Sequence, residues 1–254
     1  MFRRILFSLL LIIPAQVYGQ CNKDDPCAPK KEKNSWDKSL ATGFNLTQGN
    51  SETMLLNIMG TIHRETDQDI IDLGAQYNYG QNEEDGEDSE KKTTRNDLRA
   101  NASYDYLFSE RAFGGLGMKY LTDKISDIDY RVNVVPSAGY FLIKDAAISF
   151  AMNAGPAYTF EKIAGDENNY FSPMIGDKFT WTINCTSKLY QSADIFFDTS
   201  DSDNYMVNAE VGVESALSTM LSLVVALRDN YDHQPAAGKD SNDLALMTAL
   251  KVLF

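Results

Sequence analysis

The feature that most constrains the fold is a strict alternation of apolar and polar side chains over unusually long segments. In residues 96–108, apolar or aromatic side chains occupy every second position from Leu98 to Phe108, and polar side chains lie between them from Arg99 to Asp105. A helix would scatter these apolar positions around its circumference, whereas a strand places them on one face. Soluble strands are usually about 5–6 residues long, and tilted membrane strands about 9–11. The pattern therefore predicts membrane-spanning strands.

Segments of this kind recur about twelve times, although ten or fourteen strands would also fit, and the eighth segment is the least regular. The expected ranges are near 36–48, 53–64, 69–80, 95–108, 111–122, 128–142, 146–161, 170–184, 187–198, 204–216, 219–230 and 242–254. Bacterial single-chain barrels have an even number of antiparallel strands. The predicted fold is therefore an all-β, transmembrane, antiparallel up-and-down barrel of about twelve strands with both termini periplasmic.

The connections between these segments sort by parity, as expected of an outer-membrane barrel, which has short periplasmic turns and longer outer loops. The even-numbered connections are all short. Four of the odd-numbered ones are longer, near 81–94, 123–127, 162–169 and 231–241. A soluble β-sandwich, the competing architecture, has no reason to sort its loops in this way.

The first residues resemble a secretory signal peptide. Arg3 and Arg4 precede an apolar run from Ile5 to about Ala15, and cleavage is expected after Gly19. The apolar run is shorter than the roughly 20 residues that a transmembrane helix needs. Residues 1–19 are therefore expected to be removed on export.

The remaining chain should consist of a periplasmic arm, residues 20–34, and the barrel, residues 35–254. Removing Arg3 and Arg4 leaves 21 of the 23 basic residues against 36 acidic ones, a net charge of −15. Nucleic-acid binding needs a basic surface, so this composition excludes it.

The three cysteines are expected on the periplasmic side, an oxidising compartment where disulfides form. Cys21 and Cys27 could pair and leave Cys185 free, or Cys27 could pair with Cys185 and tie the arm to the barrel base. Cys21 could instead carry a lipid, although Tyr18 and Gln20 suit lipid attachment poorly.

The chain ends on an amphipathic segment with a terminal aromatic residue. Phe254 is in phase with Leu244, Leu246, Leu250 and Val252. This ending is similar to the signal that barrel-assembly machinery recognises, which makes that machinery an expected partner.

A family resemblance agrees with this architecture. Trp36 followed by residues 43–51, GFNLTQGNS, resembles the opening of the salt-induced outer-membrane proteins, a family of unknown function. Further likeness lies in residues 104–106, 127–132 and 139–140, and in a strand that ends at Glu161. The resemblance covers roughly residues 36–254 and implies an outer-membrane location, but it supplies no catalytic or ligand residues.

The polar face of each predicted strand should point into the lumen and carry the functional information. By parity, the charged residues on that face include Asp72, Arg99, Asp105, Lys119, Arg131, Lys178, Asp194, Glu210, Glu214 and Arg228. These side chains could pair across a filled interior, since buried charges need partners. They could instead line a narrow aqueous pore and set its selectivity.

Three functions are therefore weighed: a small passive channel for ions or solutes, a non-conducting structural or adhesive barrel, and a lipid-acting enzyme. The enzyme is disfavoured because neither His63 nor His233 is placed like the base of an outer-membrane lipase. No metal or cofactor is expected. The acidic stretch 83–90 could attract divalent cations that bridge it to lipopolysaccharide. Lipopolysaccharide and outer-membrane lipid are therefore further expected partners.

Overall fold

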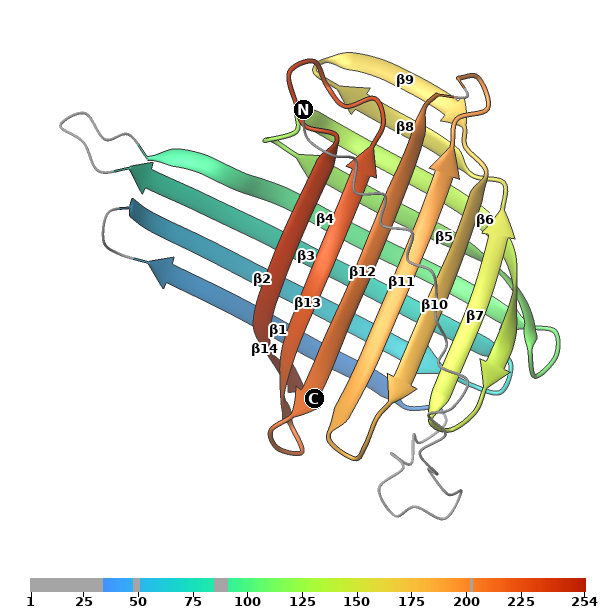
Figure 1. Ribbon diagram of the computed structural model, residues 1–254. Coiled ribbons are helices and arrows are strands. Elements are labelled where there is room, and N and C mark those ends of the chain that lie inside the picture. The colour runs from blue at the N-terminus through green and yellow to red at the C-terminus, as the bar shows by residue number, and fades with distance from the viewer. Residues whose placement is uncertain (1–33, 48–50, 85–90, 202) are drawn as a thin grey trace.

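The computed structural model describes residues 34–47, 51–84, 91–201 and 203–254. It is built from β-strands (Figure 1). Their bounds are β1 Trp36–Thr47, β2 Ser51–Glu65, β3 Asp69–Glu84, β4 Lys92–Leu107, β5 Ala112–Asp123, β6 Ile128–Lys144, β7 Ile148–Gly155, β8 Tyr158–Ile163, β9 Asp166–Phe171, β10 Met174–Thr182, β11 Ser187–Phe197, β12 Tyr205–Ala216, β13 Leu221–Asp232 and β14 Asn242–Leu253.

Twelve of these strands form a closed antiparallel barrel, as predicted. Their order around the wall is β1 to β7 followed by β10 to β14, and pairing of β1 with β14 closes the ring. The remaining two strands, β8 and β9, form a hairpin in which β8 pairs with the first half of β6, from Ile128 to Val134. Closure removes the free sheet edges, whose unpaired backbone groups are costly in lipid.

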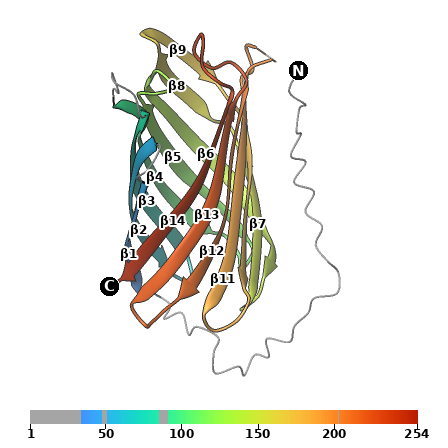
Figure 2. The same cartoon turned by 60° about the vertical axis from the view of Figure 1, so that its left-hand side comes forward.

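The two ends of the barrel differ in the way the sequence predicted. Short turns join β2 to β3, β4 to β5, β6 to β7, β10 to β11 and β12 to β13 at one end, called here the turn end. The opposite end, called the loop end, carries the β8–β9 hairpin and the segment 233–241 (Figure 2). Both Ser35 and Phe254 lie at the turn end.

The outer wall is apolar, and β14 shows why. Leu244, Leu246, Leu250 and Val252 are exposed, whereas the alternate residues Ala245 and Ala249 are buried inside the barrel. Phe254 is 68% exposed and continues the outer row. This alternation fits a wall with lipid on one side and a packed interior on the other.

The prediction of two continuous strands over 146–161 and 170–184 is wrong in detail. Each is interrupted at a proline, Pro156 and Pro173, because proline has no N–H to donate to the ladder. At the first break, a Cβ on Gly155 would lie 2.0 Å from the carbonyl oxygen of Pro136, so only glycine fits. Residues 162–169, expected to be a loop, belong mostly to the paired strands β8 and β9.

Buried hydroxyl groups hold the two breaks together. The Thr159 and Ser172 hydroxyls lie 2.6 Å apart, and both residues are 0% exposed. The Asn133 side chain donates to Thr159 Oγ1 at 2.8 Å, and the Ser172 N–H donates to the Ala157 carbonyl. These bonds fix the hairpin to the barrel wall.

The seam between the first and last strands is short. β1 pairs with β14 over four residue pairs, from Ser39–Leu253 to Thr42–Leu250, whereas β1 pairs with β2 over its whole length. The pairing register ends at Thr42. The strands still touch at the next position, where a Cβ on Gly43 would lie 2.2 Å from the Thr248 carbonyl oxygen. The first and last strands are therefore paired only near the turn end (Figure 1).

In the described part of the chain, no helix has both the length and the apolar character needed to cross a membrane. Three predictions lie outside the described residues: the signal peptide, the periplasmic arm up to residue 33, and most of the acidic stretch 83–90.

Candidate functional site: the barrel lumen

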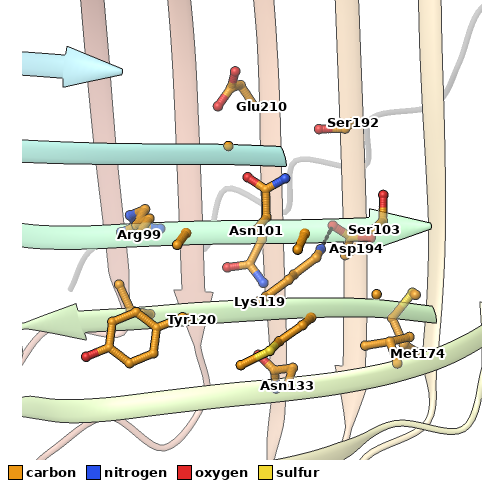
Figure 3. Close-up of a pocket in the computed structure, with 18 of the residues that line it drawn as sticks. Arg99, Asn101, Ser103, Lys119, Tyr120, Asn133, Met174, Ser192, Asp194 and Glu210 are labelled. Atoms are coloured by element: carbon orange, nitrogen blue, oxygen red, sulfur yellow. Dashed lines mark hydrogen bonds and ion pairs between the residues drawn. The ribbon is translucent and has the colours of Figure 1, made fainter. Parts of the chain in front are cut away.

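The interior of the barrel contains a cavity of about 420 Å³. Its lining is mixed: amide and hydroxyl side chains alternate with charged groups of both signs and with a few methionines (Figure 3). Eight of the charged residues predicted to face the lumen line it: Arg99, Asp105, Lys119, Arg131, Lys178, Asp194, Glu210 and Arg228.

The other two predicted residues lie close to this cavity. Glu214 accepts from Lys251 Nζ at 2.9 Å, and Lys188 Nζ lies 3.7 Å away. Asp72 is 3.6 Å from Lys178 Nζ and 2.6 Å from the Nδ1 atom of His63. Each carboxylate therefore has a lysine of another strand within 4 Å.

Lys119 and Asp194 form an ion pair across the lumen (Figure 3). Lys119 is on β5 and Asp194 is on β11, four positions away around the ring. Lys178 on β10 and Asp72 on β3 make a second, looser crossing. The lumen is thus crossed by side chains between opposite walls.

Arg131 makes a third crossing, nearer the loop end. Its Nε donates to Glu161 at 2.6 Å and its Nη2 donates to Asp232 at 2.7 Å. Arg131 is on β6, Glu161 is on the hairpin strand β8, and Asp232 ends β13 on the far wall. One buried guanidinium therefore ties together the wall, the hairpin and the opposite rim.

A fourth crossing joins β4 to β13. Arg99 Nη1 donates to the side-chain Oδ1 of Asn230 at 2.9 Å, and Arg99 Nε donates to Asp97 at 3.1 Å. On β13, Arg228 Nε donates to Glu210 of β12 at 2.8 Å.

Apolar clusters occupy the interior at two levels. At the turn end, Leu107, Phe113 and Ala151 pack together with Ile70 and Phe141. A second cluster, next to the strand breaks, consists of Val135, Ala157, Met174, Phe196 and Met206. The polar cavity is therefore bounded by apolar contacts within the barrel.

Residues 233–241, the lid loop, cover the loop end. Lys239 of this loop reaches the β5–β6 turn, where its Nζ donates to the Ile125 carbonyl at 2.6 Å and lies 2.8 Å from Asp127. Gln234 donates to Asp201 at 2.7 Å on another turn. A second cavity, of about 60 Å³, lies beneath the loop and is lined by Pro235 and Ala236 among others.

Several lumen residues were missed by the sequence analysis. Asp97 is 1% exposed and has the same parity as Arg99, so the alternation could have revealed it. Glu161 also follows the alternation of its segment. The role of Asp232 depends on which strands face each other across the ring, which alternation along one strand does not encode.

The two histidines lie apart from each other. His63 is at the turn end beside Asp72, and His233 stacks on Tyr205 with ring centroids 4.9 Å apart at the loop end. No group of three or more potential metal ligands occurs among the described residues.

Cys185 is disulfide-bonded, in the turn between β10 and β11. It is therefore not the free thiol expected if Cys21 and Cys27 pair with each other. Both of those cysteines lie outside the described residues.

A closed antiparallel ring with an apolar outer wall and a charged, polar interior defines the class of transmembrane β-barrels. The chain belongs to the family described as "Protein of unknown function, DUF481", whose model matches residues 40–254. The name salt-induced outer-membrane protein, suggested by the sequence resemblance, stays a prediction. No curated protein matches the sequence.

A solved structure of an outer membrane channel supports the fold. The COG4313 outer membrane channel from Pseudomonas putida F1 is similar, with a TM-score of 0.51 and 10% sequence identity over 87% of this chain and 96% of that chain. The NanC porin also matches, with a TM-score of 0.46 and 9% identity over 86% of this chain and 98% of that chain.

Proposed function

We propose that this protein spans the outer membrane of a Gram-negative-type bacterium as a narrow channel for ions or small polar solutes. The observation that carries the proposal is the 420 Å³ cavity lined by amides, hydroxyls and charges inside a closed barrel. Such a lining replaces part of the hydration of a polar solute and discriminates by charge. Likeness to an outer membrane channel supports the same class. The short turns and both barrel termini would then face the periplasm.

The proposed partners follow from that location. The apolar wall would contact outer-membrane lipid, the loop end would meet lipopolysaccharide, and the final strand with Phe254 would be read by barrel-assembly machinery. No enzymatic activity is proposed.

The experiment is single-channel recording of the refolded protein in a planar bilayer with unequal salt on the two sides. Discrete current steps are expected, and the reversal potential gives the sign of the preferred ion. Lys119→Met should shift the preference toward cations, and Asp194→Asn should shift it toward anions, because each leaves one charge of the crossing pair unbalanced. Arg111→Met, a change in an exposed turn, is the matched control.

The second candidate is a non-conducting barrel that supports the envelope. The four side-chain crossings and the two apolar clusters favour it, because they fill the interior. Silence in the bilayer from folded, inserted protein, in the wild type and in both charge variants, would contradict the channel and favour this alternative.

A further inference from the structure

Two arginines on opposite walls approach each other inside the lumen. Arg99 is on β4 and Arg228 is on β13, five positions away around the ring. Arg99 Nη1 donates to Asn230 at 2.9 Å. Asn230 is two residues beyond Arg228 on the same face of β13, so the two guanidinium groups are neighbours across the lumen.

Each arginine is held by a carboxylate of its own wall. Arg99 Nε donates to Asp97 at 3.1 Å, and Arg228 Nε donates to Glu210 at 2.8 Å. The side chains of Arg99 and Arg228 are only 19% and 13% exposed. Asp97 and Glu210 therefore each accept from the Nε–H of the arginine on their own wall.

Some hydrogen-bond donors of this arginine cluster have no acceptor. Within the described residues, Arg228 Nη1 and Asn230 Nδ2 are buried and have no hydrogen-bond partner. Arg95 adds a third guanidinium: its Nε donates to Asp97 at 2.9 Å, and its Nη2 has no hydrogen-bond partner and lies 3.6 Å from Asp243. Three permanent cations therefore share the two close carboxylates Asp97 and Glu210, with Asp243 more distant.

We propose that Arg228, Asn230 and Arg99 form a binding site for one small oxyanion, the carboxylate or phosphate group of a solute in the lumen. Guanidinium groups present planar pairs of N–H donors that match the oxygens of such anions. An anion there would relieve the repulsion between the facing arginines, and its oxygens would accept hydrogen bonds from the N–H groups that lack partners. The site rests on the proposed aqueous lumen but not on measurable conduction.

The test uses the full-length mature barrel, ¹⁵N-labelled and refolded in detergent micelles. The Nε–H signals of its arginines are followed by NMR during titration with sodium acetate and, separately, with inorganic phosphate, at constant ionic strength kept with sodium chloride. Saturable shifts of the Arg228 and Arg99 signals are expected. The anion whose titration saturates at the lower concentration is the one that the site prefers, acetate for a carboxylate site or inorganic phosphate for a phosphate site.

Variants sharpen the test. Asn230→Asp keeps both arginines and adds a negative charge, so it should weaken binding at least about tenfold. Arg228→Gln should abolish saturation, and Arg111→Gln, at an exposed turn, should leave it unchanged. Non-saturable shifts shared by all arginines, or saturation unaltered by Asn230→Asp, would overturn the site. Saturable binding in a barrel that is silent in bilayers would keep the site and reject only the channel.

Discussion

Arg131 is the residue with the greatest expected effect on stability. Its side chain and that of Glu161 are 9% and 5% exposed, and Asp232 is its second partner. Removing one partner of a buried ion pair leaves the other charge uncompensated. Arg131→Met should therefore lower the free energy of unfolding by about 3–5 kcal/mol.

Urea unfolding of the barrel in lipid vesicles, followed by tryptophan fluorescence, measures this effect. Adding Glu161→Gln and Asp232→Asn to Arg131→Met should restore a large part of the loss, because the orphaned charges are then gone. A cost no greater than that of Arg111→Met, in an exposed turn, would contradict the assignment.

Asp198, at the loop end beyond β11, gives a prediction about pH. Burial raises the pKa of its carboxyl, but hydrogen bonds from Ser200 and Asn204 outweigh this and hold the pKa below its ordinary value. A carboxyl whose pKa is lower in the folded state stabilises the fold above its unfolded pKa, about 3.9, and loses that effect as the pH falls through the folded value.

The contacts of Asp198 with Ser200 and Asn204 should therefore be formed at neutral pH and loosen in acid. Hydrogen exchange of the Ser200 amide, whose N–H donates to Asp198, reports this change. In Asp198→Asn, which does not titrate, protection should be lower at neutral pH and should no longer change with pH below about 5. An identical acid profile in both proteins would reject the role of Asp198.

At the scale of elements, the lid loop should control access to the lumen. Lys239 supplies its contacts with Ile125 and Asp127 on the opposite side of the ring. Lys239→Gln removes the charge from this contact, so longer or more frequent open periods are expected in single-channel records.

Lys124→Gln is the matched control for the lid loop, since Lys124 is an exposed cation at the same end of the barrel. Equal open probability in the wild type and both variants would show that the loop does not gate. Because the Lys239 contact is only partly buried, its contribution should also fall as salt is raised.

The elements were largely predictable, and the site only in part. Alternation located the strands and the faces of residues such as Arg99 and Glu210, because side chains alternate between the two faces of a strand. The hairpin was missed, since Pro156 and Pro173 break ladders that alternation alone shows as continuous. The crossing of Lys119 to Asp194 depends on the stagger of distant strands, which no local pattern encodes.

At the scale of the whole molecule, a closed ring of paired strands should resist detergent. The protein is expected to remain folded in cold SDS and to migrate differently after boiling, because every wall strand is paired on both sides. Migration that is the same before and after heating would argue against a closed barrel.

The short seam between β1 and β14 has a consequence for how the ring is made and unmade. Its four residue pairs join positions more than 200 residues apart, from Ser39–Leu253 to Thr42–Leu250. Such a long-range contact can form only after the rest of the chain has been ordered. When it forms, it adds only a few backbone hydrogen bonds. The β1–β14 junction can therefore open while the other eleven junctions between wall strands stay paired. The freed edge of β14 can then pair with a strand of another protein before the junction forms again. The β1–β14 junction is thus the point at which the ring opens and closes.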